Sequence, residues 1–85
     1  ALYRTALLIP ADDEHWIRED ERINIGQSRP YQARIRYRQP LENCVLHKTP
    51  EGLYIIFDRP QRGVTPGQFA AWYKGDELVG SGVIG

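Results

Sequence analysis

The fold is decided by one stretch of the sequence, residues 31–39, which reads YQARIRYRQ. Apolar or aromatic residues occupy its odd positions, and polar or basic residues occupy its even positions. This period of two is typical of a β-strand, because successive side chains point to opposite faces of a sheet. The pattern predicts a strand over residues 31–38, with one face in a core and the other presenting Arg34, Arg36 and Arg38.

Along such a strand the three guanidinium groups would stand about 6.6 Å apart, from a rise of about 3.3 Å per residue. This spacing suits consecutive phosphates of a nucleic-acid strand, and no acidic residue shares the arginine face. Two interpretations stay open, a surface that faces RNA and a solvent-exposed outer face of a strand. On the opposite face, Tyr31 and Tyr37 are predicted to pack in the core rather than to stack on bases.

Short β-like runs separated by Pro and Gly extend this interpretation to the rest of the chain. Further strands are predicted over residues 43–48, 53–58, 69–74 and 78–84, with a short apolar run at 6–9. Several short strands at close spacing are typical of small barrels. The sequence therefore predicts an all-β fold, a small antiparallel β-barrel of about six strands, whose core includes Trp16, Phe57 and Trp72.

Turn chemistry predicts the connections between these strands. Residues 49–52 (TPEG) are expected to form a turn, and Gly75-Asp76 a two-residue hairpin loop. Residues 12–21 fit a short helix and a strand equally well, and residues 22–30 are predicted to be a loop. In residues 60–68 (PQRGVTPGQ), Pro66-Gly67 fits the centre of a type II turn, which would project a fixed loop ahead of the next strand.

The length of 85 residues predicts one domain, residues 1–85, with a core too small for a large catalytic cavity. No apolar run is long enough to cross a membrane as a helix, and no segment resembles a signal peptide, so we expect a cytoplasmic protein with no membrane partner. The single cysteine, Cys44, excludes an internal disulfide and is predicted to be buried and inert. The chain has no methionine, even at position 1, which suggests a part of a longer protein or a processed product.

The net charge is zero, but the charges are unevenly distributed along the chain. Residues 1–28 carry three basic and six acidic side chains, whereas residues 29–62 carry seven basic and three acidic ones. Such a distribution fits a partner that is gripped on one face, and it also fits ordinary charge scatter.

Several of these segments occur in the same order and at similar spacing in one known family. They are residues 1–3 (ALY), 15–17 (HWI), 36–39 (RYRQ), 44–45 (CV), 64–68 (VTPGQ) and 80–84 (GSGVI). Over nearly its whole length the chain resembles the C-terminal β-barrel domain of the tRNA-specific 2-thiouridylases. It departs from the family pattern at Gly63, Phe69 and Ser81 and in the length of the loop between Arg18 and Tyr31.

The resemblance implies a parent enzyme that activates the wobble uridine of certain tRNAs with ATP and replaces its C2 oxygen by sulfur, delivered as a persulfide on a catalytic cysteine. The phosphate-binding loop of that enzyme and its pair of catalytic cysteines are absent from this sequence. The chain alone is therefore expected to be no enzyme and to hold no cofactor, whereas ATP is implied for the parent. The implied partners are tRNA and the N-terminal ATP-binding and central domains of the parent chain.

The predicted site is a set of RNA-binding residues with no catalytic member. Guanidinium groups pair bidentately with phosphate oxygens, and glutamine can bond a base edge or a ribose hydroxyl. For Gln39, an equally open alternative is that it anchors the turn at Pro40. The predicted residues are Arg34, Arg36, Arg38, Gln39, Arg62, Thr65 and Gln68.

Other features of the sequence argue against one alternative to an RNA-binding site, a metal site, and in favour of another, a docking surface. His15, His47 and Cys44 share no metal-ligand spacing, so no metal site is predicted. Gly80 and Gly82 would leave one strand face bare, which permits a barrel bend or the close approach of another backbone. The second functional hypothesis is therefore a structural module that docks on the parent catalytic domain through an apolar patch around these glycines and the Pro-Gly loop.

Overall fold

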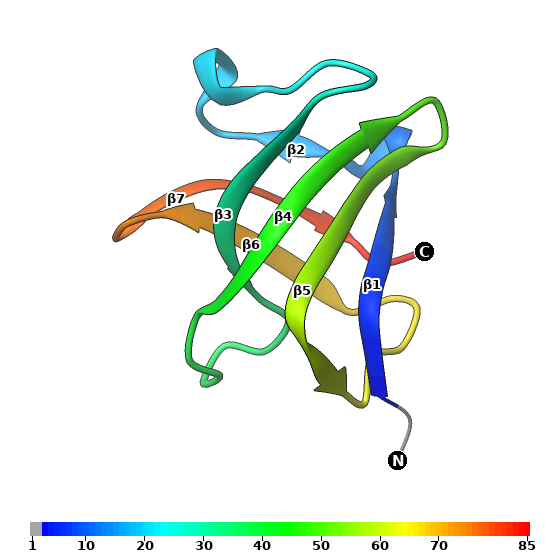
Figure 1. Cartoon of the computed structure of the whole chain (residues 1–85), viewed down its shortest axis with the longest axis vertical. Coiled ribbons are helices and arrows are strands. Elements are labelled where there is room, and N and C mark those ends of the chain that lie inside the picture. Colours follow the sequence, from blue (N-terminus) through cyan, green and yellow to red (C-terminus); the bar gives the residue numbers. More distant parts are fainter. Residues whose placement is uncertain (1–2) are drawn as a thin grey trace.

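One antiparallel sheet of seven strands curls into a half-barrel in the computed structural model, which describes residues 3–85 (Figure 1). The strand order is β1-β5-β4-β3-β6-β7-β2. The all-β prediction is confirmed, with seven strands instead of about six. The elements are β1 (Tyr3–Pro10), η1 (Ala11–Asp13), β2 (His15–Trp16), η2 (Glu19–Glu21), β3 (Ser28–Arg34), β4 (Glu42–Thr49), β5 (Gly52–Arg62), β6 (Phe69–Lys74) and β7 (Glu77–Val83), where η marks a single 3-10 turn.

The core lies on the concave side of the curled sheet. Trp16 and Trp72 meet there edge to face, with ring centroids 5.2 Å apart and an interplanar angle of 63°. Phe57 and Tyr31 are also buried, so the core predictions for these four aromatic residues are confirmed. The last residues of the chain complete the curl, because the Gly85 N–H donates a hydrogen bond of 3.0 Å to the carbonyl oxygen of Leu8 in β1.

β3 ends at Arg34, four residues before the predicted end of the strand. The Gln39 side chain accepts a hydrogen bond of 2.9 Å from the Ile35 N–H, and the Gln39 N–H donates to the carbonyl oxygen of Arg36 at 3.1 Å. These bonds close a turn over residues 35–39 and replace the ladder bonds of a strand. The predicted row of three arginines on one strand face is therefore wrong, and Tyr37, predicted in the core, is 84% exposed.

The predicted turns are confirmed at both hairpins. Residues 50–51 connect β4 to β5, and Gly75-Asp76 connects β6 to β7 with Gly75 at φ 62°. β5 continues four residues beyond its predicted end, through Pro60. Proline is tolerated there because the β1–β5 register is interrupted between the pairs Arg4–Gln61 and Ala6–Ile56, so no ladder bond is lost.

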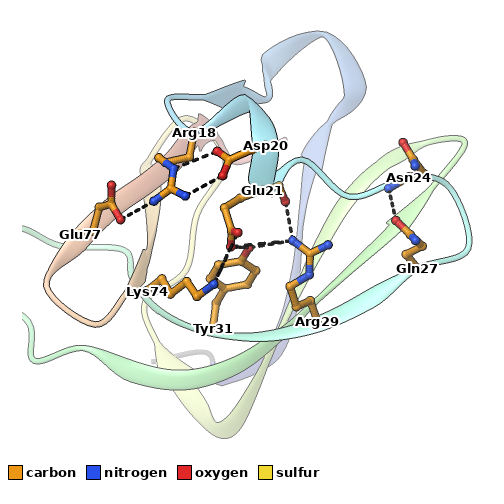
Figure 2. Close-up of polar contacts among 9 residues, drawn as sticks. All are labelled: Arg18, Asp20, Glu21, Asn24, Gln27, Arg29, Tyr31, Lys74 and Glu77. Atoms are coloured by element: carbon orange, nitrogen blue, oxygen red, sulfur yellow. Dashed lines mark hydrogen bonds and ion pairs between the residues drawn. The ribbon is translucent and has the colours of Figure 1, made fainter.

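A polar cluster fastens residues 18–27 against the sheet (Figure 2). Arg18 bonds Asp20 at 2.9 and 2.6 Å and reaches Glu77 of β7 at 2.6 Å. The Glu21 carboxylate accepts a hydrogen bond of 2.7 Å from the Tyr31 hydroxyl and another of 3.4 Å from the Lys74 ammonium (Figure 2). η2, at the top of Figure 1, is thereby tied to β3, β6 and β7.

Candidate nucleic-acid interface

The two segments that carry most of the predicted site residues are neighbours in space, although about 25 residues separate them in the sequence. The Arg36 guanidinium donates hydrogen bonds of 2.7 and 3.2 Å to the carbonyl oxygens of Arg62 and Gly63. Gly63 has φ 69°, and a Cβ there would stand 2.6 Å from the Arg36 guanidinium. Glycine therefore provides both the backbone conformation and the space for this contact.

A hollow of about 380 Å³ lies between this turn and the start of β6. We call it the arginine–aromatic hollow. No acidic residue lines it, and it contains three of the predicted site residues. Its lining consists of Arg34, Ile35, Arg36, Tyr37, Gly67, Gln68, Phe69, Ala71 and Tyr73.

Two tyrosines hold Arg34 at the wall of the hollow. Its guanidinium donates a hydrogen bond of 2.9 Å to the Tyr73 hydroxyl. Its Cζ lies 5.0 Å from the Tyr73 ring centroid and 5.6 Å from that of Tyr37, within cation–π range. The side chain is thus positioned without a carboxylate, and its charge is free to attract an anion.

Phe69 and Tyr73 are functional candidates that the sequence reasoning missed. Along β6 the odd positions 69, 71 and 73 are more exposed than Ala70 and Trp72, and Phe69 is 68% exposed. The segment reads FAAWYK, with apolar residues on both faces, so no polar face drew attention to its exposed side. The signal was nevertheless present, because the predicted burial of Trp72 puts Phe69, Ala71 and Tyr73 on the opposite face of a strand, as the structure shows.

The other predicted residues have differing surroundings. Gln39 uses its side-chain amide within the protein, with the Ile35 N–H and with Gln61, and so anchors the turn as the alternative interpretation proposed. The Gln68 side chain accepts a hydrogen bond of 3.0 Å from the Thr65 N–H, which fixes the Pro66-Gly67 turn. Gly67 has φ 92°, as a type II turn requires.

The glycines of β7 face the interior of the domain, not a partner. Trp72 lies opposite Gly80 in the β6–β7 register, and a Cβ on Gly80 would stand 2.6 Å from three atoms of the Trp72 indole. A Cβ on Gly82 would meet Ile9 and the carbonyl oxygen of Asp13. The predicted docking patch is therefore not present at the glycines, because the side chains of the domain itself fill that space.

A second groove, of about 290 Å³, does lie beside the Pro-Gly loop. β1, the end of the chain and the loop form its walls. Its apolar part is contributed by Ala6, Leu7, Leu8, Val64, Pro66 and Ile84.

Cys44 is buried, as predicted, and burial raises the pKa of its thiol to about 12. Its Sγ lies 3.5 Å from the carbonyl oxygen of Tyr31. Within residues 3–85, no three His, Cys, Asp or Glu side chains are grouped in a way that could hold a metal ion. The same described residues include no helix that is long and apolar enough to span a membrane.

Comparison with known proteins places the chain among relatives of one kind. Residues 7–84 match the aminomethyltransferase beta-barrel domain family. The chain is 52% identical over 83 residues to the tRNA-specific 2-thiouridylase MnmA of Christiangramia forsetii and 49% identical to that of Flavobacterium johnsoniae. The corresponding protein of Pseudomonas aeruginosa is 43% identical.

Each of these matches covers 98% of this chain but only 21% of the relative. The similarity is therefore complete on the side of this chain and confined to one domain of the longer proteins. The resemblance to the barrel domain of the tRNA-specific 2-thiouridylases, first noted in the short motifs, is confirmed by this coverage and by the all-β fold. The chain belongs to the aminomethyltransferase beta-barrel domain family, and over 98% of its length it is similar to one domain of the tRNA-specific 2-thiouridylases.

Proposed function

We propose that this domain binds tRNA for an enzyme that 2-thiolates the wobble uridine, and that it grips the RNA backbone near the anticodon region. Membership of the family and the names of its relatives support a tRNA substrate. The thiolation itself, with its ATP, would be carried out by the ATP-binding and central domains of a parent chain. We place the protein in the cytoplasm, where such an enzyme would meet its tRNA.

The observation that carries the proposal is the pairing state of the arginines. In the described part of the chain, four arginines form ion pairs with carboxylates, whereas five have no acidic partner, namely Arg4, Arg34, Arg36, Arg38 and Arg62. Four of these five lie on or beside the turn over residues 35–39 and the end of β5, and Arg4 of β1 pairs with Gln61 at the same end of β5. A group of uncompensated guanidiniums on one face is the electrostatic footprint of a polyanion-binding surface. The paired arginines are Arg18, Arg22, Arg29 and Arg59.

The test is a titration of the domain with an anticodon stem-loop RNA at low ionic strength, followed by amide chemical shifts. Arg38→Ala and Arg62→Ala remove exposed charges whose guanidiniums form no ion pair within residues 3–85, so both variants should fold like the native chain. Each should weaken binding and reduce the slope of log K against log salt by about 0.7 to 0.9 per lost phosphate contact.

Arg22→Ala is the matched control for this experiment. Arg22 is exposed, pairs with Glu19 and belongs to the η2 region, at the end of the molecule opposite the turn in Figure 1. The substitution removes the same charge and should leave the salt slope unchanged. If all three variants weaken binding equally, the domain attracts RNA only through its overall charge, and the proposed surface is wrong.

A second candidate function is docking on the parent catalytic domain, favoured by the groove beside the Pro-Gly loop. A docking module would show no shifts with RNA at any salt concentration. An added catalytic domain would instead perturb the amides of Leu8, Val64 and Ile84.

A further inference from the structure

The arginine–aromatic hollow combines ring faces with positive charge, which phosphate binding alone does not require. Tyr37 and Phe69 are 84% and 68% exposed, and Tyr73 forms a third wall. Single exposed apolar residues are common, but a concave group of three aromatic rings, two of them packed against a guanidinium, indicates a ligand with a flat apolar face and an anionic part.

We propose that the hollow receives one unpaired base of the RNA, stacked on Phe69, while Arg34 meets the attached phosphate. Sequence-specific contacts to RNA are made mostly with unpaired bases, which stack on aromatic side chains and arginine planes. This inference rests on the proposed function and names the part of the tRNA that the hollow takes, an unpaired loop nucleotide rather than a paired stem.

Phe69 is the member of the hollow best suited to stacking. Arg34 lies against the rings of Tyr37 and Tyr73, whereas Phe69 makes no aromatic or cation–π contact within residues 3–85. It begins β6 opposite Val83, so the sheet fixes its backbone before any ligand arrives. Binding would therefore order only the side-chain rotamer of Phe69 and not its backbone.

The charges around the hollow favour RNA over a protein partner. Its lining contains two arginines and no carboxylate, and Arg38 and Arg62 add two further positive charges near it. An apolar protein surface would gain nothing from four unpaired guanidiniums and would leave them partly desolvated. A nucleotide supplies the flat ring and the phosphate together.

The experiment compares Phe69→Leu with the native chain on two RNAs, an anticodon stem-loop and a fully paired duplex of equal length. The substitution keeps an apolar side chain at an exposed position, so the melting temperature should not change. Base–aromatic stacking of about 1–3 kcal/mol corresponds to a loss of roughly 5- to 150-fold. We expect that loss for the stem-loop and no loss for the duplex.

An abasic nucleotide at each loop position in turn identifies the stacked base. At that position the abasic RNA should bind the native chain as weakly as the intact RNA binds the Phe69→Leu variant, and the two changes together should cost no more than either alone. Ile25→Ala is the matched control, because Ile25 is 63% exposed and lies outside the hollow. It should bind both RNAs like the native chain.

The possible failures are distinguishable. If Phe69→Leu binds the stem-loop as tightly as the native chain does, while Arg38→Ala weakens it, the stacking inference is wrong and the RNA-binding proposal stands. If Phe69→Leu weakens the binding of the stem-loop and of the duplex equally, Phe69 only supports the shape of the surface, and the stacking inference is wrong. If the native chain binds neither RNA, the proposed function fails and the inference fails with it.

Discussion

Gly80→Ala adds one methyl group at the point where β7 crosses the largest buried side chain of the domain. Gly80 lies directly opposite Trp72, and the new Cβ would stand 2.6 Å from three atoms of the indole. Trp72 is fully buried, and Trp16 packs against it at a centroid distance of 5.2 Å. The ring therefore cannot move aside without displacing a second tryptophan.

The expected cost follows from two opposing effects. Overpacking a core typically costs about 1–3 kcal/mol, and we expect the upper half of this range because the contact involves a rigid indole. Gly80 has no positive φ, so alanine restricts the unfolded chain and recovers about 0.4–1 kcal/mol. The net destabilisation should be about 1–2.6 kcal/mol, or a fall in melting temperature of about 4–20 °C for a domain of this size.

The assay is urea unfolding with a double-mutant cycle. In Gly80→Ala combined with Trp72→Phe, the smaller ring makes room for the methyl group and removes an indole N–H that has no partner, so we expect a favourable coupling of about 1 kcal/mol. The control is Ser81→Ala, at the half-buried residue next to Gly80. Alanine is similar in size to serine, so the free energy of unfolding should change by less than about 0.5 kcal/mol. A Gly80→Ala variant as stable as the native chain would refute the reasoning. It would mean that the space beside Gly80 is open, as the hypothesis of docking through the glycines requires.

Three further predictions concern buried or paired groups. Lys48→Met should lower the free energy of unfolding in urea by about 3–5 kcal/mol, because it leaves the Glu14 carboxylate, 2% exposed, without its cation. Adding Glu14→Gln should recover most of this loss, because the glutamine oxygen still accepts the hydrogen bond from the Trp16 indole. The hydrogen bond from Tyr31 lowers the pKa of Glu21 below its ordinary value of 4.5. Its ionised form therefore stabilises the fold above about pH 4.5, and the difference in melting temperature between the native chain and Glu21→Gln should vanish as the pH falls through the lowered pKa. Cys44 should resist iodoacetamide at pH 8 in the native chain and react once urea unfolds it; equal rates in both states would contradict its burial.

The sequence predicted those parts of the fold that depend on local alternation and turn chemistry. Tyr31 and Ala33 are buried and Gly75-Asp76 closes a hairpin, because each of these features is determined within a few residues. The end of β3 is determined by a turn over residues 35–39, which Gln39 closes through Ile35 and Arg36 and which the bond from Arg36 to the backbone of Arg62 holds against β5. The alternation of residues 31–38 indicates neither the turn nor the long-range bond, so the arginines were expected on a straight strand.

The same limit explains what was missed at the candidate site. The resemblance and the basic stretch led to two segments that are neighbours in the structure, which brings Arg34, Arg36 and Gln68 to one hollow. The ring of Phe69 was not recognised, although the predicted burial of Trp72 implies it by alternation, because a strand that is apolar on both faces does not indicate that its outer face has a function. Gly80 was assigned to a bare outer face for a related reason, since the side chain that fills its space comes from the neighbouring strand.

The turn after Arg34 changes what this domain can contribute to tRNA binding. A straight row of arginines would offer repeated phosphate contacts and little else, whereas a turn beside β6 places charge and rings around one concavity. One stacked base and a few phosphate contacts supply only modest affinity, which falls steeply with salt. In the proposed multidomain enzyme that would be sufficient, because a covalent connection between two RNA-binding domains gives an effective concentration of about millimolar for the second contact. We therefore expect the isolated domain to bind weakly and to add selectivity for an exposed loop base once a catalytic domain holds the same tRNA.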